Sequence, residues 1–119
     1  MIYKTSLYVS HVIVINDGST DATEAELADL SSQYPHIKII SLEKNRGKGF
    51  ALLEGFRYAF THIEFDILIT LDGDAQHQPE DIPTLIQAIQ ESVDMAIAAR
   101  QFHLMPPKIN LATPLFLMY

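Results

Sequence analysis

Short apolar runs alternate along the chain with longer segments in which apolar residues recur every three or four positions. Short runs rich in β-branched residues predict buried strands, and the longer periodicity predicts amphipathic helices. The predicted strands are residues 12–15, 37–42, 67–71 and 94–99. The predicted helices are residues 22–33, residues 49–62 and a third helix that begins near Asp81.

The order of these elements is strand, helix, strand, helix, strand, helix, strand. Such an alternation predicts an α/β fold, in which a parallel sheet carries helices on its faces. Residues 101–119 contain three prolines and end in the apolar sequence LFLMY. This segment fits either a core helix, which is the commoner case, or an amphipathic piece that lies on a membrane.

Length and composition narrow the classes of protein. A chain of 119 residues holds one small domain, and 48% hydrophobic with 19% charged residues is typical of a globular protein. The net charge of −7 argues against a nucleic-acid partner. The absence of cysteine excludes disulfides and thiolate metal sites. No apolar run is long enough to span a bilayer, and the first residues lack the apolar core of a signal peptide.

Two carboxylates stand one residue apart at the end of the predicted strand 67–71. They are Asp72 and Asp74, separated by Gly73, which lets the backbone bend or a ligand approach closely. The carboxyl ends of strands in open α/β sheets are where ligands bind. Two close carboxylates repel each other, and a divalent cation removes this cost. Oxygen ligands without cysteine predict Mg²⁺ or Mn²⁺, ions that usually also hold substrate phosphate.

Two other interpretations of this D-x-D pattern remain open. A solvated acidic turn before a helix has the same composition. A phosphatase-type site would use the first Asp as a nucleophile. That family places Thr or Ser two residues after the second Asp, where this chain has Gln76.

Polar residues also follow the other predicted strands. Asp17 follows the strand at residues 12–15, and Arg46 lies in a Gly-rich turn after the strand at residues 37–42. A Gly-rich turn that enters a helix can present backbone N–H groups and a cation to an anion, although an ordinary loop has a similar composition. In a parallel sheet all three strand ends open on the same edge, which predicts a substrate cleft there.

Three motifs taken together are more specific than any of them alone. The three motifs are, in chain order, VIVINDGSTDAT, EKNRGKGFALLEGFRYA and ILITLDGDAQHQPEDIPTLI. They closely resemble family 2 glycosyltransferases of the GT-A fold, with the nearest similarity to the dolichyl- or polyprenyl-phosphate sugar synthases. The resemblance covers roughly residues 12–102. It implies a Rossmann-like, mainly parallel sheet with helices on both faces.

The resemblance also implies roles for individual residues. Asp17 corresponds to a contact to the nucleotide base or ribose, and Arg100 lies where the family places an Arg near donor or acceptor phosphate. The implied nucleotide-sugar-binding residues are Asp17, Arg46, Asp72, Asp74 and Arg100. The implied metal ligands are Asp72, Asp74 and Gln76. We expect His77 to lie behind the metal site or in solvent rather than on the metal, and we identify no general base.

The chain departs from the family pattern at both ends. Relatives begin with a central strand that ends in a P-x-Y-N-E-like segment, which Met1 to Ser10 lack, and they continue with acceptor-binding elements beyond Tyr119. The resemblance therefore predicts a single partial domain, truncated at both ends, in which residues 101–119 begin an incomplete acceptor-side region. We expect the neighbours of the missing strand to close up, or residues 2–9 to fill its place.

The implied activity is transfer of a sugar from a GDP or UDP sugar to an acceptor, for which a polyprenyl phosphate is the candidate. Mg²⁺ or Mn²⁺ would bridge the diphosphate. We expect a cytoplasmic protein that works at the membrane face if the acceptor is a lipid phosphate. The main alternative is an inactive remnant that acts at most as a binding or partner subunit. A phosphatase-like enzyme that shares only the D-x-D is the third hypothesis.

Overall fold

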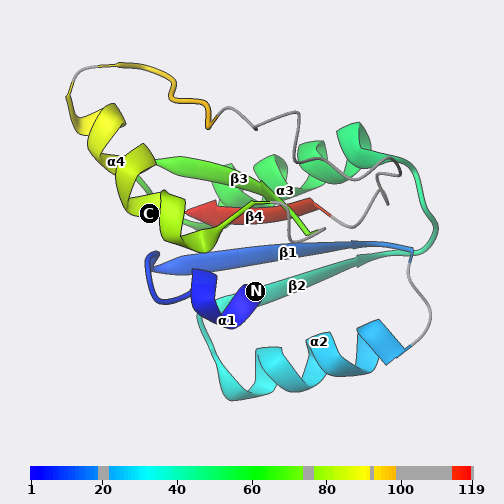
Figure 1. Ribbon diagram of the computed structural model, residues 1–119. Helices are drawn as coiled ribbons and strands as arrows, with labels where there is room; N and C mark the ends of the chain where they lie inside the picture. Colours follow the sequence, from blue (N-terminus) through cyan, green and yellow to red (C-terminus); the bar gives the residue numbers. More distant parts are fainter. Residues whose placement is uncertain (19–21, 74–76, 92, 99–113, 119) are drawn as a thin grey trace, which may run out of the picture.

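The computed structural model describes residues 1–18, 22–73, 77–91, 93–98 and 114–118, which form one sheet flanked by helices (Figure 1). The strands, in the order β2-β1-β4-β3 across the sheet, are β1 (His11–Asp17), β2 (Ile37–Leu42), β3 (Leu68–Asp72) and β4 (Pro114–Met118). The helices are α1 (Ile2–Thr5), α2 (Ala22–Gln33), α3 (Lys48–His62), the 3₁₀ turn η1 (Pro79–Asp81) and α4 (Ile82–Gln90).

Three of the four strands run in the same direction. β1 and β2 are parallel, with Val12 opposite Ile37 and Asp17 opposite Leu42. β4 is antiparallel to both β1 and β3, so β3 shares the direction of β1 and β2. The predicted α/β class is confirmed, and the carboxyl ends of β1, β2 and β3 meet at one edge of the sheet, as expected.

The core lies on both faces of the sheet because β1 is apolar on both sides. Val12 and Val14 belong to one buried cluster, which receives side chains from α1, α2 and α4. Ile13 and Ile15 belong to a second cluster, which packs against α3. Alternate residues of a strand point to opposite faces, so the run VIVI supplies both layers. This packing fixes the end of β1, and with it Asp17, relative to the start of α3.

The position of β4 corrects two expectations. Residues 114–118 form a strand, not the core helix or membrane-surface piece that was predicted. This strand lies between β1 and β3, so these two strands do not close up, and residues 2–9, the alternative occupant that we expected, begin with the short helix α1. Unpaired ladder groups of β1 and β3 need partners, and a short extended apolar segment supplies them. Pro114 stands at the first strand residue, where proline is tolerated.

The predicted strand at residues 94–99 was wrong over its described part. Residues 93–98 form irregular structure, and the side chains of Val93, Met95 and Ile97 are exposed. The alternate positions hold Asp94 and two alanines, which offer little apolar surface to bury on a sheet. Apolar residues at every second position were therefore not sufficient for this segment to pair as a strand of the sheet.

Across the described parts of the chain, no helix has the length and apolar character needed to cross a bilayer.

Candidate functional site

Three of the predicted site residues lie on the edge where β1, β2 and β3 end. Asp17 is the last residue of β1, Asp72 is the last residue of β3, and Arg46 lies in the loop between β2 and α3. The other predicted site residues, Asp74, Gln76 and Arg100, lie outside the described residues.

The carboxylate of Asp17 holds the loop that follows β2. Its Oδ1 accepts a hydrogen bond from the backbone N–H of Arg46 (2.9 Å), and its Oδ2 accepts one from the N–H of Gly47 (3.0 Å). The Oδ1 of Asn45 is a further acceptor for the Gly47 N–H (3.0 Å). Asp17 is buried, with 8% of its surface exposed, so these charge-assisted bonds are only weakly screened by water. Asp17 therefore positions the Arg46 loop, a role that the sequence did not predict.

Gly18 allows the end of β1 to approach this loop closely. Its φ of +79° lies in the left-handed region that glycine adopts without strain. A Cβ at this position would overlap the backbone nitrogen of Asn45 and lie 2.8 Å from the carbonyl carbon of Lys44. The positive φ and the close approach each require glycine at this position. The close approach lets β1 lie against the loop that Asp17 holds.

We expect Gly18→Ala to lower the free energy of unfolding by about 2 kcal/mol, because the alanine would be strained and would push the loop away from β1. Gly49→Ala is the matched control. A Cβ at Gly49 meets no atom within 4 Å, and Gly49 lies in α3, where alanine is the better helix former. Urea denaturation of the two variants measures the difference. Equal stabilities would show that β1 does not press against the loop.

A cationic and aromatic pair lies beside this loop. The guanidinium carbon of Arg46 is 3.8 Å from the centroid of the Phe50 ring, a stacked arrangement that fixes the exposed guanidinium. A cavity of about 300 Å³ opens next to the pair. Its lining residues are Ser41, Leu42, Glu43, Lys44, Arg46, Phe50 and Glu54. Its lining holds two basic and two acidic side chains, so the cavity as a whole carries no excess of positive charge for an anionic ligand.

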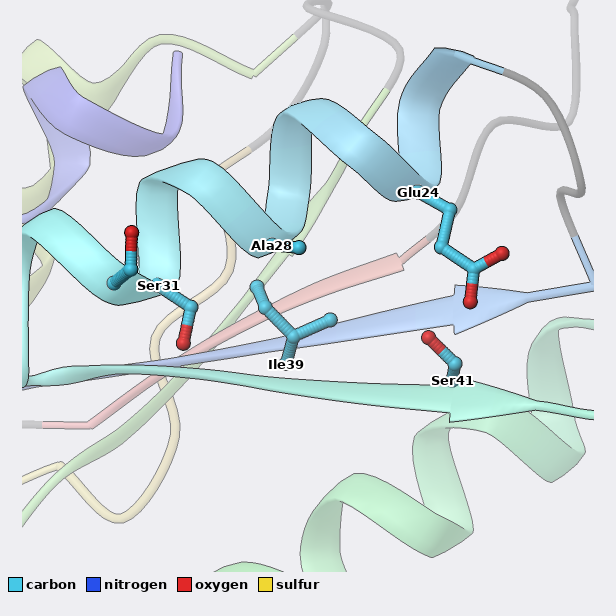
Figure 2. A pocket seen from close by; sticks show the side chains of 6 residues that line it. Glu24, Ala28, Ser31, Ile39 and Ser41 are labelled. Carbon is cyan, nitrogen blue, oxygen red and sulfur yellow. The ribbon is translucent and has the colours of Figure 1, made fainter.

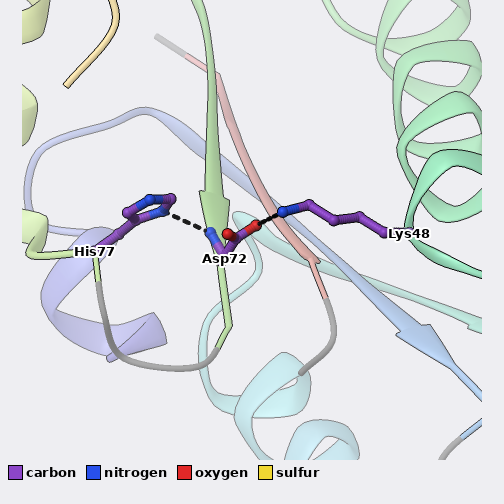
Figure 3. Close-up of polar contacts among 3 residues, drawn as sticks. All are labelled: Lys48, Asp72 and His77. Atoms are coloured by element: carbon purple, nitrogen blue, oxygen red, sulfur yellow. Dashed lines mark hydrogen bonds and ion pairs between the residues drawn. The ribbon is translucent and has the colours of Figure 1, made fainter. Parts of the chain in front are cut away.

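Asp72 is held by contacts to its side chain and to its backbone (Figure 3). The Lys48 ammonium forms an ion pair with the Asp72 carboxylate, and the Asp72 N–H donates a hydrogen bond to Nδ1 of His77 (2.8 Å). In the neutral ring this acceptor role places the proton on Nε2. The two contacts hold Asp72 in place at the end of β3. His77 thus contacts the backbone of Asp72, and its place relative to a metal stays a prediction.

The donor chemistry at Asp72 fits a hard cation. A carboxylate oxygen is a ligand that Mg²⁺ and Mn²⁺ accept, and in this structure it already attracts one positive charge, the Lys48 ammonium. Within the described ranges, no group of three or more acidic, His or Cys side chains could hold a metal. The other two predicted ligands, Asp74 and Gln76, lie outside those ranges, so the complete ligand set stays a prediction.

A larger cavity, of about 510 Å³, lies between α2 and β2 (Figure 2). Its lining residues are Glu24, Ala28, Ser31, Ser32, Ile39 and Ser41. Two of the hydroxyl groups donate hydrogen bonds to backbone carbonyls, Ser31 to Ile37 (3.2 Å) and Ser32 to Asp29 (2.7 Å). The lining contains an acidic side chain and no basic one, so this cavity does not favour a phosphate ligand.

Comparison with known proteins decides the family. A profile described as glycosyl transferase family 2 matches residues 3–112. The chain belongs to glycosyl transferase family 2. The match covers most of the chain and confirms the resemblance that the three motifs carried. The α/β architecture with helices on both faces of the sheet agrees with the GT-A fold of this family.

Curated proteins similar to this family 2 chain include transferases named for dolichol phosphate and undecaprenyl phosphate. The chain is 39% identical over 89 residues to a dolichol-phosphate mannosyltransferase of Pyrococcus furiosus, covering 75% of this chain and 24% of the relative. It is 35% identical over 92 residues to an undecaprenyl-phosphate 4-deoxy-4-formamido-L-arabinose transferase of Edwardsiella ictaluri, covering 76% and 27%. The protein of the same description from Enterobacter is 33% identical over 91 residues, covering 76% and 27%.

The chain therefore spans about a quarter of the length of the curated relatives it matches. The comparison with solved structures gives no match. The roles of the individual site residues in binding a nucleotide sugar and a metal stay predictions.

Proposed function

We propose that this chain forms the donor-binding part of an enzyme that transfers a sugar from a nucleotide diphosphate sugar to a polyprenyl phosphate. The observation that carries the proposal is the arrangement at the sheet edge. Asp72 lies at the end of β3 with a cation on its carboxylate, and the Arg46 loop is held by Asp17 at the end of β1, on the same edge of the sheet. In a family 2 member, these groups suit a diphosphate and its counter-ion.

The loop between β2 and α3 supplies positive charge for the diphosphate. Arg46 is exposed and stacked on Phe50, so its guanidinium N–H groups are available to phosphate oxygens without a large loss of side-chain freedom. α3 begins at Lys48 with no acidic residue in its first turn and no side-chain cap. The N-terminal end of this helix therefore adds a favourable partial charge for an anion.

Asp72 would hold the metal ion together with Asp74 and Gln76. The Asp72 N–H bond to His77 fixes the backbone from which the carboxylate projects. When bound, Mg²⁺ or Mn²⁺ would offset the negative charge that builds on the leaving diphosphate. Departure of that diphosphate is the step at which negative charge develops, so the cationic groups of this chain would stabilise the transition state.

The acceptor proposal rests on the printed descriptions of the similar proteins, which name dolichol phosphate and undecaprenyl phosphate. A lipid phosphate is already ionised at neutral pH, so its attack on the sugar needs less help from a general base than an alcohol would. We propose that Arg100, which follows the last predicted strand, lies near the donor or acceptor phosphate. An enzyme with such an acceptor would act at the cytoplasmic face of the membrane.

The test is thermal unfolding of the purified chain with and without Mn²⁺, in the presence of GDP, UDP or their sugar conjugates. A ligand that binds only the folded state stabilises it by about 2.7 kcal/mol at a hundredfold excess over Kd. We expect a rise in the unfolding midpoint that needs both Mn²⁺ and one of the two nucleotides. The preferred nucleotide then identifies the donor base.

Asp72→Asn is the control variant, since it keeps the size of the side chain and removes its charge. We expect it to abolish the shift that depends on Mn²⁺. A wild-type chain that unfolds cooperatively and shows no shift with any nucleotide would refute the proposal. A shift without sugar transfer to an added polyprenyl phosphate would instead favour a nucleotide-binding subunit.

A further inference from the structure

We infer that Lys48 is a resident counter-ion of Asp72 that a divalent cation displaces, and that the released ammonium then binds the diphosphate. Lys48 would thereby couple binding of the metal to binding of the nucleotide. The inference rests on the proposed function, because it concerns the same metal and diphosphate site. It adds the order in which metal binding frees Lys48 and Lys48 then binds the diphosphate. It also gives a role to Lys48, for which the sequence motifs implied none.

The first support is the contact between the Lys48 ammonium and the Asp72 carboxylate (Figure 3). The Asp72 side chain is only 17% exposed, whereas that of Lys48 is 48% exposed. A partly buried carboxylate gains from a cation close by, and the more exposed partner can leave into solvent at low cost. The pair is therefore built so that Lys48, and not Asp72, is the mobile member.

The second support is the position of Lys48 in the fold. It is the first residue of α3, and the N-terminal end of a helix carries partial positive charge. A lysine at this position is unfavourable for the helix itself, and the first turn holds no acidic residue that would compensate. Gly47 precedes it at a φ of +89°, and its N–H is held by Asp17, so the point from which the Lys48 side chain starts is fixed. These features indicate that Lys48 serves to bind a negatively charged group and not to stabilise the helix.

The consequence is coupling between the two ligands. A metal that arrives alone must break the ion pair and leave Lys48 without its partner, so it binds weakly. When a nucleotide diphosphate arrives with the metal, the released ammonium gains phosphate oxygens beside Arg46 and the end of α3. Each ligand then raises the affinity for the other by the same factor, as thermodynamic linkage requires.

The test compares Mn²⁺ binding, measured by electron paramagnetic resonance, in wild type, Lys48→Met, Lys48→Arg and Lys38→Met. We expect Lys48→Met to bind Mn²⁺ alone about fivefold more tightly, the gain expected when a competing ion pair of this exposure is removed. The factor by which the nucleotide diphosphate tightens Mn²⁺ binding should fall about tenfold. Lys48→Arg should stay close to wild type. Lys38→Met removes the same charge from β2, where Lys38 lies over the Tyr58 ring, and should change neither value.

A second measurement follows the lysine itself by amine labelling and mass spectrometry. We expect Lys48 to be labelled faster in Asp72→Asn and in wild type with Mn²⁺, and to be protected again when nucleotide is added. If wild type binds Mn²⁺ and nucleotide while Lys48→Met gains no Mn²⁺ affinity and Lys48 labelling stays constant, the inference fails and the proposed function stands. If wild type binds neither ligand, the proposed function fails and the inference fails with it.

Discussion

Phe116→Pro is expected to lower the free energy of unfolding by about 3 kcal/mol or more, because it removes a backbone donor from the centre of the sheet. Phe116 lies opposite Ile13 of β1 on one side and opposite Thr70 of β3 on the other. Proline has no N–H, and its ring takes the place of the hydrogen that would point to the neighbouring strand, so it removes a ladder bond and obstructs the pairing there. Urea denaturation followed by circular dichroism measures the loss.

Phe116→Leu is the control, since it keeps the backbone donor and an apolar side chain. We expect it to cost far less than the proline variant. If Phe116→Pro and Phe116→Leu had equal stability, β4 would not lie between β1 and β3. If Phe116→Pro only loosened the residues near the end of the chain and left the free energy of unfolding of the sheet unchanged, the observed strand order would also be contradicted.

The same variant tests a link between the sheet and the site. β4 is the strand that joins β1 to β3, and these two strands end in Asp17 and Asp72. The distance between the two carboxylates therefore depends on the ladder bonds of β4. Under the proposed function, Phe116→Pro should also abolish stabilisation by Mn²⁺ and nucleotide, even at a temperature where part of the chain remains folded.

The sequence was sufficient to predict the elements whose signal is local. Residues 37–42 form β2 as predicted, and residues 22–33 form α2, because each of these segments carries its own apolar period and clear boundaries. The shared edge for Asp17, Arg46 and Asp72 was also predictable. It follows from the direction of parallel strands and does not depend on side-chain detail.

The rest depends on contacts between distant parts of the chain. Residues 114–118 form a strand because the edges of β1 and β3 offer backbone groups that need partners. The short apolar sequence of residues 114–118 does not by itself reveal this pairing. Residues 94–98 carry a strand-like alternation but are not in the sheet. The ion pair of Lys48 with Asp72 joins residues 24 apart. The local sequence hinted at this ion pair only through a lysine at the N-terminal end of a helix, where a positive charge is electrostatically unfavourable.

Asp17→Ala is the second large effect that we expect. The carboxylate accepts hydrogen bonds from the N–H groups of Arg46 and Gly47, and bonds to a charged acceptor contribute about 1.5–3 kcal/mol each. Asn45 remains as a second acceptor for the Gly47 N–H, which limits the loss. We expect the free energy of unfolding to fall by about 3 kcal/mol, and Arg46 to lose its fixed place beside Phe50.

Amide hydrogen exchange separates this positioning role from a direct contact to the nucleotide. In protein without ligand, Asp17→Ala should speed exchange at the amides of Arg46 and Gly47, which lose their acceptor. Asp29→Ala is the control, because it removes an exposed carboxylate that accepts a surface hydrogen bond from Gln33 (2.8 Å), and it should change stability by less than about 0.5 kcal/mol. If the two amides exchange at the wild-type rate in Asp17→Ala while nucleotide binding is lost, Asp17 acts on the ligand and does not hold the loop.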